Sequence, residues 1–155
     1  MNTLILGLGN TLLSDEGVGV HVLEALAADA LPESVTLLDG GTLSFTLAGP
    51  IQEHDALIVV DAAQLQCSPG SVRVFIGQDM DAFLLHNRRS SVHEVGLTDL
   101  RAMAMLAGHW PENRALVGIQ PQKLDWGEAP THEVAAAIPA ACAAVHAVLR
   151  RWLEA

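Results

Sequence analysis

The sequence predicts an α/β fold: a single three-layer sandwich in which a mostly parallel, twisted sheet of about five strands lies between helices. Short apolar segments of strand length alternate with longer segments whose apolar residues recur at helical spacing. The strand-like segments are apolar at consecutive positions, which is typical of strands buried on both faces of a parallel sheet. Hydrophobic residues fill 50% of the 155 positions, enough to bury one core, so residues 1–155 are predicted to form one domain.

The first part of the chain alternates strands and helices. Gly9-Asn10 closes the first apolar run, and Ser14 or Asp15 is expected to cap the helix that follows. The predicted elements are a strand over Thr3–Leu8, a helix with the apolar face Val18, Val22, Leu23 and Leu26, a strand over Val35–Leu38, a short helix over Leu43–Leu47 that ends before Gly49-Pro50, and a strand over Ala56–Val60.

The second part begins with the turn Ser68-Pro69-Gly70. This turn leads into a strand that is expected to be an antiparallel neighbour of Ala56–Val60, because the two lie close in sequence. The predicted elements are a strand over Ser71–Ile76, a polar loop over Asn87–Glu94, a helix over Leu97–Ala107, a strand over Leu116–Ile119 and a C-terminal helix from about Thr131 to Leu153.

Acidic residues and a histidine follow the predicted strands. Ligands of open parallel sheets bind outside the carboxyl ends of the strands. Glu16 follows the first strand, Asp39 the second and Asp61 the third, and His93 lies in the polar loop. We therefore expect the chemistry of this protein at that edge of the sheet.

These residues bear on two nucleotide-binding interpretations. Gly7-Leu8-Gly9 after a strand, with Asp39 after the next, is compatible with dinucleotide binding. However, Leu12 occupies the third glycine position, and Asp15-Glu16 would repel a pyrophosphate at the helix start. A phosphate-binding loop is excluded because the only lysine, Lys123, is not in a Gly-Lys-Ser/Thr motif.

A metal site is the second interpretation. Two carboxylates and one imidazole, from Glu16, Asp61 and His93, suit a divalent transition ion and leave positions open for water or substrate. The competing interpretation is that these residues only cap helices and turns, which acids and histidines often do. The residues alone leave both possibilities open.

Charge and cysteine usage limit the partners and the compartment. Eight basic and 18 acidic residues give 8 − 18 = −10, which opposes attraction to nucleic acids and anionic membranes. No uninterrupted apolar run reaches the roughly 20 residues of a membrane span.

Cys67 and Cys142 are 75 positions apart and form no metal or disulfide motif, so we expect a cytoplasmic protein without a signal peptide. A monomer is the default for a domain of this size.

Five segments occur in a characteristic order along the chain. They are Gly7-Leu8-Gly9-Asn10-Thr11-Leu12-Leu13-Ser14-Asp15-Glu16-Gly17-Val18-Gly19, Asp39-Gly40-Gly41-Thr42, Val59-Val60-Asp61-Ala62, His93-Glu94-Val95-Gly96-Leu97 and Val117-Gly118-Ile119-Gln120-Pro121. This set resembles the hydrogenase maturation endopeptidases, which process the large subunit of nickel-iron hydrogenases. The likeness extends from about Thr3 to the C-terminal helix.

The resemblance implies a function and a site. The family removes a short C-terminal extension from the large-subunit precursor after nickel insertion, so the precursor is the implied partner and supplies the nickel. The family's metal-contacting positions fall on Glu16, Asp61 and His93. The family fold, a twisted sheet between helices, agrees with the α/β prediction.

Two mechanisms and two functions stay open at this stage. Glu16, Asp61 and His93 could grip the nickel and position the scissile peptide, with Asp39 accepting a proton. Alternatively, Asp39 and Asp61 could form an aspartic acid pair, which requires carboxylates close enough to share a proton. A non-cleaving module that only recognises nickel proteins would need the same ligands. The loop Asp125-Trp126-Gly127-Glu128 has no assigned role beyond a hypothesis of partner discrimination.

Overall fold

The computed structural model describes residues 1–41, 47–86, 97–106 and 108–154. Strands and helices alternate along most of the chain, as the sequence predicts. The elements are β1 (Thr3–Leu8), the short 3-10 helix η1 (Ser14–Gly17), α1 (Val18–Ala27), β2 (Val35–Gly41), α2 (Ala48–Gln52), β3 (Ala56–Ala62), β4 (Val72–Ile76), α3 (Gln78–His86), α4 (Leu97–Leu106), β5 (Asn113–Ile119) and α5 (His132–Glu154).

The strands form one five-stranded sheet in the order β2-β1-β3-β5-β4. Neighbouring strands are parallel except β4, which runs antiparallel to β5. The antiparallel direction of β4 was expected, but its pairing with β3 was wrong, because β5 lies between them. Residues 115–119 of β5 are buried and suit the sheet interior, whereas β4 is partly exposed and carries Arg73, which suits an edge.

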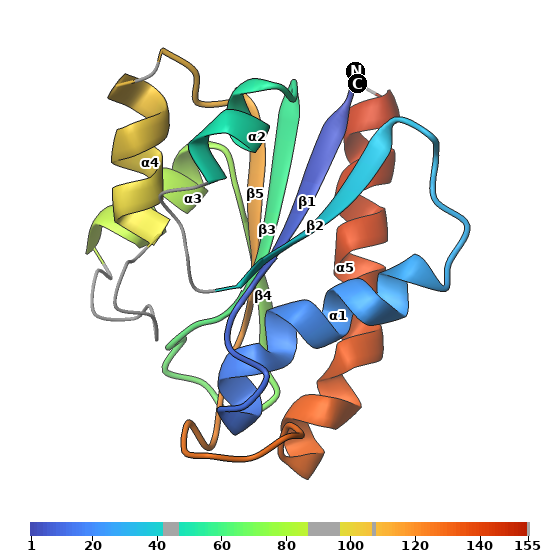
Figure 1. The fold of residues 1–155 in the computed structure, drawn as a ribbon, viewed down its shortest axis with the longest axis vertical. Helices are drawn as coiled ribbons and strands as arrows, with labels where there is room; N and C mark the ends of the chain where they lie inside the picture. The colour runs from blue at the N-terminus through green and yellow to red at the C-terminus, as the bar shows by residue number, and fades with distance from the viewer. Residues whose placement is uncertain (42–46, 87–96, 107, 155) are drawn as a thin grey trace.

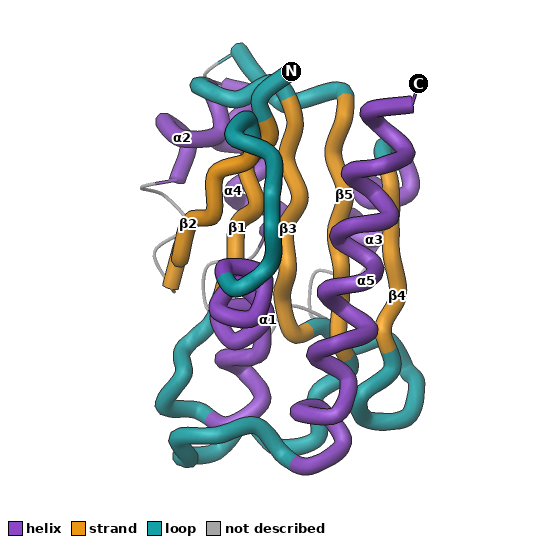
Figure 2. The backbone as a smooth tube through the Cα atoms, turned by 90° about the vertical axis from the view of Figure 1, so that its right-hand side faces the viewer, coloured by secondary structure: helices purple, strands orange, loops and turns teal. Residues whose placement is uncertain are grey.

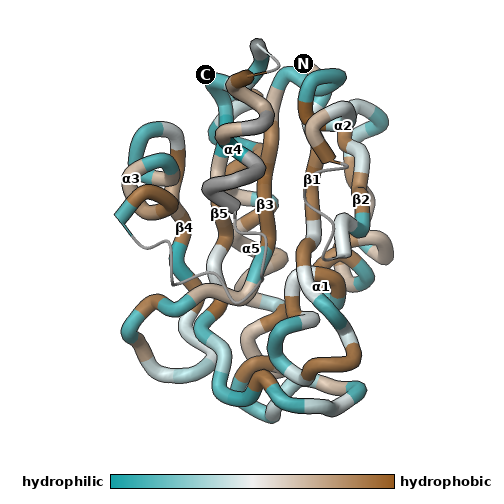
Figure 3. The backbone as a smooth tube through the Cα atoms, turned by 60° about the vertical axis from the view of Figure 1, so that its left-hand side comes forward, coloured by the Kyte–Doolittle hydropathy of each residue, from teal (hydrophilic) through white to brown (hydrophobic). Residues whose placement is uncertain are grey.

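Helices cover both faces of this sheet. Figure 1 shows α1 and α5 on one side and α2, α3 and α4 on the other, and Figure 2 shows α1 and α5 lying side by side over the strands. Each face has its own core: one includes Ile58 and Val60 with residues of α1 and α5, and the other includes Leu57 and Val59 with residues of α2 to α4. The three-layer α/β prediction is confirmed. Figure 3 shows the hydrophobic character concentrated along β1 and β3.

Two helices differ from the sequence predictions. The short helix was expected to end before Gly49-Pro50, but α2 starts at Ala48 and includes both residues. Pro50 fits there because the main-chain nitrogens of a first helical turn have no partner inside the helix. Residues 42–46, where most of the predicted helix falls, lie outside the described residues. Helix α3 was not predicted, and β5 starts at Asn113 rather than Leu116.

The long helix α5 belongs to the core. By length and composition it is apolar enough to cross a membrane. Its apolar face, which includes Val134, Val145 and Trp152, packs in the same core as Val60 and α1. The buried face of α5 is therefore part of this core.

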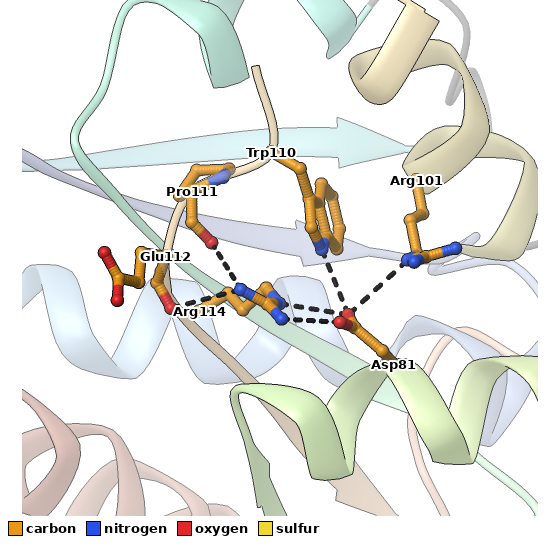
Figure 4. Close-up of polar contacts among 6 residues, drawn as sticks. All are labelled: Asp81, Arg101, Trp110, Pro111, Glu112 and Arg114. Atoms are coloured by element: carbon orange, nitrogen blue, oxygen red, sulfur yellow. Dashed lines mark hydrogen bonds and ion pairs between the residues drawn. The ribbon is translucent and has the colours of Figure 1, made fainter. Parts of the chain in front are cut away.

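Asp81 of α3 connects α3, α4 and β5. Its Oδ1 accepts hydrogen bonds from Trp110 Nε1 and Arg114 Nε, both at 3.0 Å, and its Oδ2 forms an ion pair with Arg114 of β5. Arg101 of α4 lies 3.5 Å from the same carboxylate (Figure 4). Burial favours a higher pKa for Asp81, but the hydrogen bonds from Arg114 and Trp110 and the charges of Arg114 and Arg101 together lower the pKa.

Candidate functional site

The carboxyl ends of β1 and β3 lie at the end of the sheet where α1 begins (Figure 1). Glycines allow the start of α1 to approach this edge closely. A Cβ on Gly19 would lie 2.3 Å from the Val60 carbonyl oxygen and 2.5 Å from that of Leu8. Gly9 has φ +126°, and a Cβ there would lie 1.9 Å from the Glu16 carbonyl oxygen. The opening glycines therefore permit close packing of η1 and α1 on β1 and β3.

Glu16 and Asp61 are the two predicted site residues that the structure brings to this edge with buried side chains. Glu16 belongs to η1 and is 8% exposed, and Asp61 lies one residue before the end of β3 and is 0% exposed. Contacts join η1 to β3. Carboxylate oxygens are ligands that divalent metal ions bind in proteins. This donor chemistry fits a divalent metal ion.

Asp39 is placed differently. It is exposed on β2, and its Oδ1 accepts a hydrogen bond of 2.9 Å from the Gly41 N–H. In the sheet register Asp39 pairs with Gly7 of β1, which pairs with Val60 of β3. Asp39 and Asp61 are therefore about two strand spacings apart, roughly 10 Å between backbones. Side chains alternate along strands, so Asp39 shares the sheet face of Val60, and Asp61 points to the other face. This register opposes a proton-sharing pair.

His93, the third predicted ligand, lies outside the described residues. Within the described ranges, no group of three His, Cys, Asp or Glu side chains is arranged to hold a metal ion. A complete metal site would therefore need a donor beyond those ranges or from the substrate. The role of His93 as that donor stays a prediction.

Asp15 and Ser14 do not cap helix α1, contrary to the sequence prediction. Gly17 is the residue before α1, and no side chain caps it. The Asp15 carboxylate instead accepts main-chain N–H hydrogen bonds from Gln122 (2.8 Å), Lys123 (2.9 Å) and Thr131 (2.7 Å). Because Asp15 is fully buried, its side-chain oxygens need hydrogen-bond donors of this kind in place of water. The sequence could not indicate that these donors come from a loop more than a hundred residues away.

Gln120 is a second residue whose role was not predicted from the sequence. Its buried side-chain Oε1 accepts a hydrogen bond from the Leu65 N–H (2.6 Å), and its Nε2 donates to Gln64 Oε1 (2.9 Å). These bonds join the end of β5 to the loop that follows Asp61. Gln120 therefore fixes the backbone beside the site, a role for which the sequence carries no local signal.

Comparison with known proteins decides the family. A family model described as "Hydrogenase maturation protease" matches residues 20–148. The chain belongs to this family. HupD of Rhizobium leguminosarum bv. viciae, a hydrogenase expression/formation protein, is 40% identical over 96% of this chain and 74% of its own length. The hydrogenase 2 maturation protease of Escherichia coli K12 is 36% identical over 97% of this chain and 92% of its own.

A solved structure shows the same fold. The hydrogenase maturating endopeptidase HybD from E. coli superposes with a TM-score of 0.87 at 36% identity, covering 97% of this chain and 93% of that one. As a hydrogenase maturation protease, the chain is a peptidase. The resemblance found in the sequence motifs is confirmed, and the dinucleotide-binding interpretation is set aside.

Proposed function

We propose that this hydrogenase maturation protease removes the C-terminal extension from the nickel-loaded large-subunit precursor of a nickel-iron hydrogenase. The observation that carries the proposal is the placement of buried Glu16 and Asp61 at one sheet edge of a chain in this family. Relatives named as a maturation protease and a maturating endopeptidase favour cleavage over recognition alone. The extension and the nickel are carried over from the resemblance of the motifs.

In this proposal the nickel belongs to the substrate. Glu16 and Asp61, with His93 as the third donor, bind the ion that the precursor already holds, since two carboxylates and an imidazole suit a divalent transition ion. Binding the ion places the neighbouring peptide bond at the edge of the sheet, where correct positioning supplies part of the catalysis. A precursor without nickel would lack this anchor. The metal therefore acts as a checkpoint for complete assembly.

We favour nickel-assisted hydrolysis over an aspartic acid pair. An ion at Glu16 and Asp61 can polarise the scissile carbonyl or activate water. The pair mechanism needs Asp39 and Asp61 within proton-sharing distance, whereas the register separates them by one strand and by sheet face. In this version of the nickel-assisted mechanism Asp39 is not the proton acceptor, because it is exposed and lies on the sheet face opposite Asp61. Asp39→Asn distinguishes the mechanisms. The pair mechanism requires a loss of cleavage rate as severe as that of Asp61→Asn, whereas nickel-assisted hydrolysis without Asp39 predicts a loss below about tenfold, smaller than the loss of a general base.

The cleavage reaction itself can be tested by intact-mass spectrometry of the nickel-loaded precursor. Glu16→Gln and Asp61→Asn remove a charge with little change of shape. We expect each variant to lower the cleavage rate at least about 100-fold, the scale of losing one group that stabilises a transition state. Glu33→Gln, at an exposed carboxylate, is the control and is expected to cleave normally. Normal cleavage by Glu16→Gln would exclude Glu16 from the site.

We also propose that the protein acts in the cytoplasm. Cys67 and Cys142 are both free thiols, and Cys67 is exposed. Free cysteines are typical of reducing compartments.

A further inference from the structure

The loop of residues 122–131 is fastened to the turn that carries Glu16. The Ser14 N–H donates to the Gly127 carbonyl (2.9 Å), and the Gly127 N–H donates to the Leu12 carbonyl (2.9 Å). The Asp15 N–H donates to the Lys123 carbonyl (3.0 Å). The Ser14 hydroxyl donates to the Asp125 carbonyl at 2.8 Å. Bonds in both directions join the two segments, so the 122–131 loop has a fixed position beside Glu16.

Asp15 anchors both ends of this loop. Its Oδ2 accepts the N–H groups of Gln122 and Lys123 at the start, and its Oδ1 accepts the N–H of Thr131, the residue before α5, at the end. The Thr131 hydroxyl also donates to Asp15 Oδ2 at 2.9 Å. Because Asp15 precedes Glu16 directly in the chain, this carboxylate fixes the position of the loop relative to Glu16.

The anchored segments expose large apolar side chains. Trp126 is 76% exposed and Leu124 is 37% exposed, and both lie in the 122–131 loop. Leu12, whose carbonyl is bonded to this loop, is 51% exposed. A tryptophan held in water on an ordered loop gains no stability from its apolar area in the free protein. Tryptophan is, however, enriched among the residues that contribute most to protein–protein binding.

We infer that the 122–131 loop is a docking surface for the folded large-subunit precursor, with Trp126 as its main contact and Asp15 as the positioning residue. This inference rests on the proposed function. A precursor whose nickel reaches Glu16 must cover the surface around Glu16, and the loop is bonded to residues 12–15 of the same turn. The precursor is therefore the partner that this apolar surface meets during cleavage.

Trp126→Ala tests the surface in steady-state cleavage of the nickel-loaded precursor. We expect the KM to rise at least about tenfold, the scale of losing one interface contact, with kcat within about threefold because Trp126 is not one of the proposed nickel ligands. Leu106→Ala, at a leucine 90% exposed on α4, is the matched control and is expected to cleave normally. An unchanged KM for Trp126→Ala would overturn the inference.

Other outcomes of this experiment are also decisive. If wild type self-associates in analytical ultracentrifugation, and Trp126→Ala abolishes the association without changing the KM, the surface binds a second copy and the inference is wrong. If wild type cleaves normally but Trp126→Ala behaves like wild type, the inference fails while the proposed function stands. If wild type does not cleave the loaded precursor, the proposed function itself has failed.

The positioning role of Asp15 is tested through its coupling to Trp126. Asp15→Asn places an amide among hydrogen-bond donors and loosens the loop, so we expect a raised KM in protein that remains folded by circular dichroism. If Asp15 acts through the loop, the double variant raises the KM little more than Trp126→Ala alone. A purely structural role predicts that the two KM effects multiply, and that result would overturn the role.

Discussion

Gly19 illustrates how single residues shape the site. The glycines of the opening motif could be mistaken for a phosphate-binding pattern, but Gly19 lies against the main-chain oxygens of Val60 and Leu8. Its hydrogen side chain lets α1 begin directly on β1 and β3, beside Glu16 and Asp61. Because a larger side chain at this position would clash with the main chain, a substitution of Gly19 should lower the stability of the protein as well as its activity.

Gly19→Ala is expected to destabilise the protein by about 1–3 kcal/mol, the usual cost of forcing a methyl group into a packed interior. Gly49→Ala is the matched control, because a Cβ there meets nothing within 4 Å. It lies in helix α2, where alanine is favoured over glycine, so we expect no loss of stability. Urea unfolding followed by circular dichroism measures both. Equal stability of Gly19→Ala and wild type would contradict the packing shown here.

At the scale of elements, Asp81 and its partners hold α3 and α4 on the sheet. The partners are Arg101, Trp110 and Arg114. These helices flank residues 87–96, which include the predicted ligand His93 and lie outside the described residues. Arg114 brings β5 into the same cluster, and Trp110 adds the segment before β5 (Figure 4). One carboxylate therefore joins four parts of the chain, and its ionisation should affect how firmly they are held together.

Asp81→Asn is expected to lower the free energy of unfolding by about 2 kcal/mol at neutral pH, as for the loss of hydrogen bonds to a charged group. The pKa of Asp81 is lowered in the folded protein, so its contribution is complete above the ordinary aspartate pKa of about 4 and disappears as pH falls through the folded value. The difference in free energy of unfolding between wild type and Asp81→Asn should therefore become smaller below about pH 4. Exposed Asp79→Asn is the control. A difference in unfolding free energy that does not change with pH would contradict the stabilising role of the ionised Asp81 carboxylate.

Most helices and strands could be predicted from the sequence, but the order of the strands in the sheet could not be predicted completely. The strands at Thr3 and Ala56 are uninterrupted apolar runs, and the helices at Val18, Leu97 and His132 carry apolar residues at helical spacing. The order of β4 and β5 was missed because sequence proximity favoured a hairpin with β3, whereas burial places β5 inside the sheet. Helix α3 was missed because its nine residues carry only a weak pattern, with Met80 and Leu84 buried.

At the scale of the whole molecule, parallel strands bring separate parts of the chain to one edge. Strand-end reasoning placed Glu16 and Asp61 correctly at this edge. The same reasoning placed Asp39 with them, but Asp39 is exposed and lies on the sheet face opposite Asp61. The sheet face of a side chain depends on the strand register, which the sequence does not show. The sequence also suggested a helix cap for Asp15 and no role for Gln120, because the hydrogen-bond partners of both residues are distant in sequence. A monomer without affinity for nucleic acids or membranes stays a prediction from size and charge.

The central claim is that this peptidase cleaves only a precursor that presents nickel to Glu16 and Asp61. The most direct measurement is the intact mass of nickel-free and nickel-loaded large-subunit precursor from the same organism, each incubated with wild-type protein. We predict that only the loaded precursor loses its C-terminal extension. Equal cleavage of both forms would contradict the nickel checkpoint, and an uncut loaded precursor would contradict the assignment of this substrate.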